Sequence, residues 1–504
     1  MRPLVTPAFA LAFALAVAAP VRGHQPAQSA PTADVAVDVY RLAERGYAEA
    51  LIARADALLG RAAGNREQEA AAHAQRAVGL AALDRDEEAA AALRLALERQ
   101  PSEPRTYWLC YLAARHLPAP EPLLDVVTAA SRFVPPESRS DLHLIFTLDD
   151  MLWLHRMLST GADPGRLALL SEALVAIGWP GDHDPQAGDI FRMDMVDRHL
   201  AAGDRAAAAR VAATVAGPEA VQMLAIDRRY EGLSPAWERP AETIAAAWDR
   251  QDRTTRAALL AQPNSLRYLL LRVRLLRARG REAEAAELLA PSVATAETTY
   301  APQPQGRLVL EEAAQALFAL GRVEEAVAVS TRLAALEQAM DARDTAAAVR
   351  HVGFLWQAGR TEASIAEGER LLRERGGHLT AYARSWLLSV LSCALRDAGR
   401  TAEAEIHLRS LLESGHPPAG TRALLCANRL DEAEALVIRR LEEGDRLVLQ
   451  ALQDWRSGGA AAGRLAPLEE RLRILRARGR VAAALERVGR VLPLPATRMT
   501  PEIF

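Results

Sequence analysis

A short phrase centred on the dipeptide Gly-Arg recurs along one stretch of this chain, and it constrains the fold more than any other feature. Each copy lies between two segments of amphipathic pattern. A glycine can adopt a positive φ angle and so end a helix, and the alanines that follow let a second helix start close by. The copies are Arg279-Gly280-Arg281-Glu282-Ala283-Glu284-Ala285, Leu320-Gly321-Arg322-Val323-Glu324-Glu325-Ala326, Ala358-Gly359-Arg360-Thr361-Glu362-Ala363 and Ala398-Gly399-Arg400-Thr401-Ala402-Glu403-Ala404. Each copy therefore predicts the turn of a helical hairpin.

The segments on either side of the phrase have the apolar spacing of helices. Around the first copy, apolar residues recur at i, i+3, i+4 and i+7, so each helix has one face to bury. These residues are Leu266, Leu269, Leu270, Val273 and Leu276 before the glycine, and Ala285, Leu288 and Leu289 after it. Because one hairpin cannot cover its own apolar faces, successive hairpins are expected to stack into a solenoid.

The repeats resemble the tetratricopeptide repeat (TPR) family, whose period is about 34 residues. The best match to the family's spacing is formed by Ala77, Leu80, Asp84, Ala89, Leu93, Ala96, Leu97 and Pro101, with Asp84 where glycine is usual. More degraded copies turn at Gly46, Gly203, Asn428 and Gly479. The resemblance, together with the near absence of strand patterns, predicts an all-α superhelical solenoid of stacked antiparallel helix hairpins.

Composition excludes several kinds of chemistry. The chain has 61 basic residues and all of them are arginine, which rules out Schiff-base lysines and the phosphate-binding P-loop. The net charge of −3 gives no electrostatic case for a nucleic-acid partner, so none is expected. The sequence also shows no nucleophile elbow, no dinucleotide fingerprint and no Cys-x-x-Cys pair, so we expect no enzyme activity and no cofactor.

The first residues have the pattern of an export signal. Arg2 precedes an apolar run from Ala8 to Ala19, and small residues allow cleavage after Gly23 or after Ala18, of which Gly23 is preferred. We expect residues 1–23 to be a signal peptide and 24–37 a flexible leader, with an uncleaved anchor as the alternative. The mature protein is then periplasmic or secreted, without a stable membrane span.

Three cysteines are too few for a disulfide framework. Cys393 and Cys426 are 33 residues apart, close to one repeat, so they can lie on the first helices of neighbouring hairpins and pair. Their places within the aligned repeats differ by about one helical turn, and buried free cysteine is the commoner state. A free state is therefore favoured over a bridge.

We expect N-terminal repeats over 38–102, a less regular helical region over 103–262, a C-terminal array over 263–492 and a tail over 493–504. In the irregular region, Tyr107, Trp108 and Tyr111 have the spacing of a core stripe. His143 and His155 lack the spacing of paired metal ligands, and the turn around His183 has no partner cluster, so no metal site is expected.

In TPR proteins the first helix of each hairpin faces the concave side, and this resemblance implies which residues line a peptide-binding groove. They are Arg267, Arg274, Arg277, Gln315, Phe318, Trp356, Gln357, Trp386, Arg396, Arg473 and Arg476, with Cys393 beside them. Guanidinium and aromatic groups together suit an extended peptide of acidic character. The family's Lys and Asn carboxylate clamp is missing. The alternatives are that the arginines are solvated and that the tryptophans fill gaps between hairpins.

The resemblance thus implies an exported scaffold that binds a protein or peptide segment. Two alternatives stay open: a structural component of an envelope export or polysaccharide assembly machine, and an enzyme with a catalytic insert within 103–262 around His143, His155 and His183.

Overall fold

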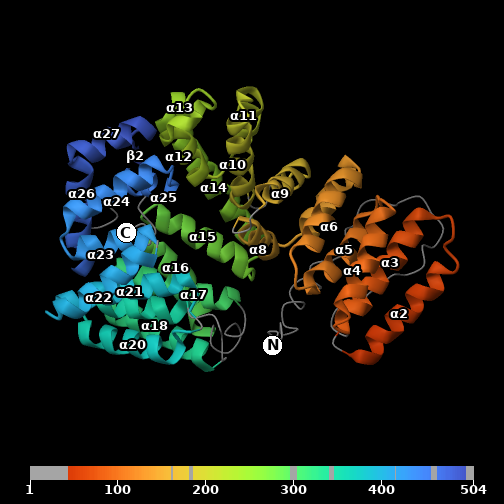
Figure 1. Ribbon diagram of the computed structural model, residues 1–504, viewed down its shortest axis with the longest axis horizontal. Helices are drawn as coiled ribbons and strands as arrows, with labels where there is room; N and C mark the ends of the chain where they lie inside the picture. Colours follow the sequence, from red (N-terminus) through yellow and green to blue (C-terminus); the bar gives the residue numbers. More distant parts are fainter. Residues whose placement is uncertain are drawn as a thin grey trace. The chain divides into compact units, whose positions relative to one another are not determined.

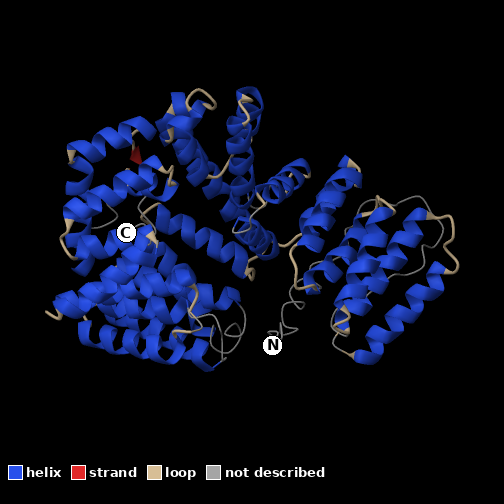
Figure 2. Ribbon diagram, in the orientation of Figure 1, coloured by secondary structure: helices blue, strands red, loops and turns tan. Residues whose placement is uncertain are grey.

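The computed structural model describes most of the chain. Its described residues are 42, 44–159, 163–180, 185–295, 304–339, 346–377, 379–414, 416–455 and 463–494. The predicted signal peptide and leader, and His183 with its turn, lie outside them. Figure 1 shows the described helices along the sequence and Figure 2 their secondary structure.

The fold is all-α, as predicted. In the described ranges the regular structure is helical apart from a two-residue parallel pairing of β1 (Asp454–Trp455) with β2 (Pro493–Leu494). The chain divides into two compact units, residues 1–216 and 217–504. The domain boundaries given above stay predictions. None of the helices that the structure describes has the length and apolar character needed to cross a membrane.

Unit 1 contains stacked hairpins in which first helices pack on first helices and second helices on second helices. Thus α3 packs against α5, and α4 against α6. Tyr107 and Tyr111 are buried in this core, as predicted. The helical elements of unit 1 are α2 (Arg45–Leu59), α3 (Arg66–Ala82), α4 (Asp86–Glu98), α5 (Pro104–His116), α6 (Glu121–Phe133), η3 (Pro136–Asp141), α7 (Leu142–Ile145), α8 (Leu148–Ser159), α9 (Pro164–Ala176), α10 (Pro185–Ala201) and α11 (Arg205–Ala212).

Unit 2 holds the main array. Each first helix packs on the preceding hairpin, so that α15 contacts α17, α19 contacts α21, and α21 contacts α23. Its elements are α12 (Pro218–Ile226), η4 (Arg228–Tyr230), α13 (Pro235–Glu238), α14 (Pro240–Ala261), α15 (Leu266–Ala278), α16 (Glu282–Thr295), α17 (Pro304–Ala319), α18 (Val323–Ala339), α19 (Ala346–Gln357), α20 (Thr361–Arg375), α21 (Ala381–Asp397), α22 (Thr401–Ser414), α23 (Pro417–Cys426), α24 (Leu430–Glu442), α25 (Arg446–Ala451), η6 (Gly463–Leu465), α26 (Ala466–Ala477) and α27 (Gly479–Val488).

The Gly-Arg phrase forms the hairpin turns because its glycine adopts a positive φ angle, as predicted. The turn glycines of all four copies have φ between 71° and 78°. At the first copy, the amide of Arg281 donates to the carbonyl of Leu276 at 2.8 Å, which closes the end of the helix. The Arg281 guanidinium then pairs with Glu284 three residues later, at the start of the second helix. Arginine after the glycine therefore fixes the entry to the next helix.

The weaker copies vary in how they turn. Gly203 and Asn428 adopt positive φ, as does Asp84 in the best TPR match. Gly479 instead begins α27, and Gly46 lies in the first turn of α2, so neither supplies a left-handed turn residue. The prediction of a turn at Gly46 is wrong, because Gly46 lies within α2, whereas the chain does turn at Gly479, where α26 ends and α27 begins.

The first and last elements of unit 2 lie against each other. The amide of Arg490 donates to the carbonyl of Ile226 at 2.9 Å, and its guanidinium lies 4.0 Å from the centre of the Trp237 ring. Arg446 donates to the hydroxyl of Tyr230 at 2.5 Å. Figure 1 shows α12 and α13 beside α27 and β2. The array of unit 2 therefore closes on its own beginning.

Cys393 and Cys426 form a disulfide, which corrects the preference for free thiols. Both cysteines lie on first helices, Cys393 on α21 and Cys426 at the end of α23, with their Cα atoms 5.3 Å apart. The helix α23 has only ten residues, which offsets the difference of one helical turn that the alignment indicated. Cys110 is free and buried.

Candidate functional site

The residues predicted to line a groove all lie on first helices. They occur on α15 (Arg267, Arg274, Arg277), α17 (Gln315, Phe318), α19 (Trp356, Gln357), α21 (Trp386, Arg396) and α26 (Arg473, Arg476). Their side chains differ in exposure: Arg267, Arg274 and Arg473 are exposed, while Arg277, Phe318, Trp356 and Trp386 are buried. Whether they bind a ligand stays a prediction, but the structure shows what each one contacts.

The arginines of α15 are paired with an acid from the next hairpin. Arg274 Nε donates to Glu312 Oε1 at 2.7 Å, and Arg277 Nη1 donates to Glu312 Oε2 at 2.5 Å. Arg277 Nη1 also donates to the amide oxygen of Gln315 at 2.8 Å. The side chains of Arg277 and Glu312 are each only 7% exposed, so this pair belongs to the packing between α15 and α17.

The polar contacts continue onto α19. Gln315 Nε2 donates to Glu311 Oε1 at 3.3 Å, and Glu311 forms an ion pair with Arg350. Glu311 and Glu312 thus connect three successive first helices. These side chains form a polar layer between successive first helices. Of the two α15 arginines in this layer, Arg277 is buried and Arg274 is exposed.

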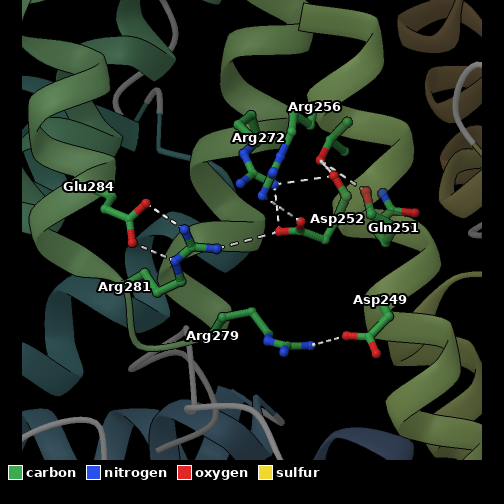
Figure 3. Close-up of polar contacts among 9 residues, drawn as sticks. Asp249, Gln251, Asp252, Arg256, Arg272, Arg279, Arg281 and Glu284 are labelled. Atoms are coloured by element: carbon green, nitrogen blue, oxygen red, sulfur yellow. Dashed lines mark hydrogen bonds and ion pairs between the residues drawn. The ribbon is translucent and has the colours of Figure 1, made fainter.

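A second polar cluster fixes α15 against its other neighbours. Asp252 on α14 accepts from Arg272 at 2.7 Å and pairs with Arg256 and Arg281, while Arg281 also pairs with Glu284 (Figure 3). Burial acts to raise the pKa of Asp252, but the hydrogen bond from Arg272 and the three positive charges lower it overall. This cluster positions the helix that carries the predicted groove arginines.

The two predicted tryptophans are buried but linked to polar groups. Trp356 Nε1 donates to Asp397 Oδ2 at 2.9 Å, and Asp397 also pairs with Arg464 at 3.1 Å. Trp386 packs edge-on against Tyr382 and His416, whose ring centres are 6.2 and 5.9 Å away. The tryptophans therefore lie between hairpins, as the alternative prediction had it. Tyr382, however, is 52% exposed and extends the aromatic group to the surface.

The sequence analysis missed Arg422, which lies between the two tryptophans. Its guanidinium carbon is 5.0 Å from the centre of the Trp356 ring and 6.0 Å from that of Trp386. The residue is 4% exposed, and burial lowers its pKa to about 10. The available signal was its place one helical turn before Cys426, on a first helix.

The remaining predicted residues make local contacts. Arg396 lies 3.5 Å from Glu405, Arg473 pairs with Glu470 on its own helix, and Arg476 Nη1 lies 3.1 Å from the carbonyl oxygen of Gln453. Gln357 is half-buried. The structure thus gathers Trp356 and Trp386 with Arg422 around one point, and leaves the arginines of α26 in contacts of their own.

Two histidines of the alternative enzyme hypothesis, His143 and His155, lie in the described ranges, and each makes its own contacts. His155 Nε2 lies 2.8 Å from Asp194, and Ser159 Oγ lies 3.4 Å from His155 Nδ1, which resembles a triad in composition. Ser159 donates its proton to the backbone carbonyl of His155 at 2.7 Å, however, so the hydroxyl is not directed to the imidazole. His143 contacts the carbonyl of Ile177. Across the described ranges, no three metal-ligating side chains converge.

These features define an α-helical repeat protein built of TPR-like hairpins. No family model matches the chain, and no curated protein matches it. Among solved structures it is similar to the human IFIT1 dimer with PPP-AAAA, at 14% identity over 90% of this chain and 95% of that one, with a TM-score of 0.30. It is also similar to a circular tandem repeat protein, at 15% identity over 88% of this chain and 98% of that one, with a TM-score of 0.14.

The expectation that excluded nucleic acid is corrected by these comparisons. A further similar structure is the human IFIT1 dimer with m7Gppp-AAAA, at 13% identity over 90% of this chain and 96% of that one, with a TM-score of 0.30. The names of both IFIT1 structures include an oligonucleotide, so the expectation of no nucleic-acid partner, which rested on the net charge of −3, does not stand. Net charge failed as a criterion because it averages over the surface and says nothing of one local site.

Proposed function

We propose that this protein is an exported helical-repeat scaffold that binds an extended protein segment along the first helices of unit 2. Export is supported by the apolar run after Arg2 and by the Cys393–Cys426 disulfide, since structural disulfides persist in oxidising compartments. The scaffold role is supported by the packing of first helices on one another, α15 on α17, α19 on α21 and α21 on α23.

One observation carries the proposal for binding. Tyr382 is a large aromatic side chain that is half exposed while its ring packs against Trp386 and His416. A tyrosine held by rigid neighbours supplies contact area at little cost in conformational entropy, which is why such residues concentrate binding energy in protein interfaces. The buried guanidinium of Arg422 lies 6.0 Å from the ring centre of Trp386, the neighbour that holds Tyr382.

The test is selection of binding peptides from a displayed random library, followed by fluorescence anisotropy with the selected peptides. Tyr382→Ala is expected to weaken their binding about 30-fold, which corresponds to about 2 kcal/mol for an interface hot spot. The matched control is Ile406→Ala, because Ile406 is 63% exposed but lies on the second helix α22. Its effect is expected to be less than about twofold.

Two results would contradict the proposal. One is that no selected peptide binds the folded protein. The other is that Ile406→Ala weakens binding as much as Tyr382→Ala, which would place the contact on the second helices.

A further inference from the structure

Arg422 is a buried cation without an acidic partner among the described residues. No ion pair or hydrogen bond to its side chain is present there, and its Nε and Nη2 atoms are both buried and unpartnered. Burial is the one cause of its lowered pKa, so no nearby acid offsets the desolvation. Buried charges in proteins are ordinarily paired, because desolvating an ion is costly. The two indole rings supply only a cation–π contact in place of a counter-ion.

The two unpartnered nitrogens form one particular edge of the guanidinium. Several arginines of this protein use the Nε and Nη2 edge to hold both oxygens of one carboxylate, with one nitrogen donating to each oxygen, although single contacts also use Nη1, as from Arg277 to Glu312. Eight described pairs use it: Arg85–Glu88, Arg229–Asp227, Arg281–Glu284, Arg322–Glu325, Arg370–Glu367, Arg400–Glu403, Arg429–Glu432 and Arg473–Glu470. On Arg422 the same edge has no carboxylate.

Two further unpartnered donors lie on the neighbouring helix α21. They are Trp386 Nε1 and Ser389 Oγ, both buried. Helices α21 and α23 run in the same direction, since Tyr382 packs on His416 at their starts and Cys393 bonds to Cys426 at their ends. One turn before the disulfide on each helix, this register places Ser389 and Arg422 at the same level. The donors therefore belong to one small region, and the disulfide holds the two helices that supply them.

We propose that Arg422 binds a carboxylate of the bound protein segment through its Nε and Nη2 edge, with Trp356 and Trp386 flanking the pair. The source of that carboxylate rests on the proposed function, whereas the site itself does not. Tyr382 and His416 pack on Trp386, the ring that flanks Arg422, and of these two residues Tyr382 is exposed and His416 half-buried. A segment that packs on Tyr382 thus brings an acidic side chain or a chain terminus to Arg422.

The experiment measures the thermal midpoint and the tryptophan fluorescence of the full chain during titration with acetate at constant ionic strength. Acetamide is the uncharged control, and inorganic phosphate and an oligoadenylate are parallel probes. Wild type is expected to respond saturably to acetate and not to acetamide. Arg422→Met is expected to abolish the response, and Arg422→Lys, which keeps the charge but not the fork, to weaken it at least about tenfold. Arg429→Met is the matched control and should keep the full response.

Circular dichroism confirms that each variant is folded before it is compared. The Lys variant decides the matter if the Met variant does not fold. The proposal is overturned if wild type shows no saturable response to acetate, or if Arg422→Met responds as wild type does. Binding of phosphate or the oligonucleotide through Arg422 at least about tenfold more tightly than acetate would overturn the assignment of a carboxylate.

The two proposals fail in different ways. An acetate response that depends on Arg422, without any binding peptide, leaves this site standing and refutes the scaffold proposal. Peptides that need Tyr382 but bind Arg422→Met with unchanged affinity leave the scaffold standing and refute the bound segment as the source of the carboxylate. Comparing the affinity of a selected acidic peptide with that of the same peptide carrying amides in place of its carboxylates makes the same distinction directly.

Discussion

Removal of Glu312 tests whether the arginines of α15 are held by the next hairpin. Glu312 accepts from Arg274 and Arg277, and both Glu312 and Arg277 are 7% exposed at their side chains. Removing one partner of a buried pair ordinarily costs about 3–5 kcal/mol of unfolding free energy. Arg277 keeps Glu282 at 3.2 Å and Gln315 at 2.8 Å. We therefore expect Glu312→Ala to lie at the lower end, at about 3 kcal/mol.

A double-mutant cycle separates the pair from its surroundings. Arg277→Met alone leaves Glu312 buried beside Arg274, whereas Arg277→Met with Glu312→Leu replaces both charges by apolar groups of similar volume. The double variant is expected to lie within about 1 kcal/mol of wild type, which gives a coupling energy of at least about 1.5 kcal/mol. The measurement is urea unfolding followed by circular dichroism, comparing variants with unchanged m-values.

The control is the exposed pair Arg473 with Glu470, whose side chains are 63% and 53% exposed. A cycle on this pair is expected to give a coupling of about 0.5 kcal/mol or less, because water screens it. If the Arg277 and Glu312 cycle gave no more than this control, the polar layer between α15 and α17 would contribute nothing to stability. The reasoning from burial would then be refuted.

Three other predictions follow from single features of the structure. Thiol titration should find no reactive thiol in the native protein, one in the unfolded protein and three after reduction, because Cys393 is bonded to Cys426 and Cys110 is buried; three thiols in the unfolded, unreduced protein would disprove the bridge. Replacing both bonded cysteines by alanine should cost about 3–4 kcal/mol of unfolding free energy for a loop of this length. Burial lowers the pKa of His351 below its usual value near 6.5, so the folded state binds fewer protons than the unfolded state and stability should fall as pH drops through 6.5. His351→Gln should make the urea midpoint depend less on pH between 7.5 and 5.5, and an unchanged pH dependence would contradict this role of His351. Gly399→Ala should cost about 1 kcal/mol in the same assay, because a Cβ there meets no atom within 4 Å and only the φ of 78° opposes it.

The repeat architecture could be predicted because it depends on local signals. A left-handed residue such as Gly321 or Gly399 and the apolar spacing around it determine a hairpin without any knowledge of distant residues. The positive φ of Asn428 shows that the same signal survives when glycine is replaced by a residue that tolerates that region. The closure of unit 2 through Arg490 and Tyr230 was not predictable, because it joins residues more than 200 positions apart.

In the candidate site too, local features could be predicted from the sequence and contacts between hairpins could not. The family pattern correctly assigned Arg274 and Trp386 to first helices, but it could not show that Glu312 of the next hairpin neutralises Arg274. Charge balance in a stacked repeat is set between hairpins, so a row of arginines in the sequence overstates the free positive charge of the folded face. Arg422 is the opposite case, since it is inconspicuous in sequence and becomes distinctive only because no described acid reaches it. All basic residues of this chain are arginine, and many of the described ones pair with a carboxylate. The arginine that points to a binding site is therefore the buried one that has no carboxylate among the described residues.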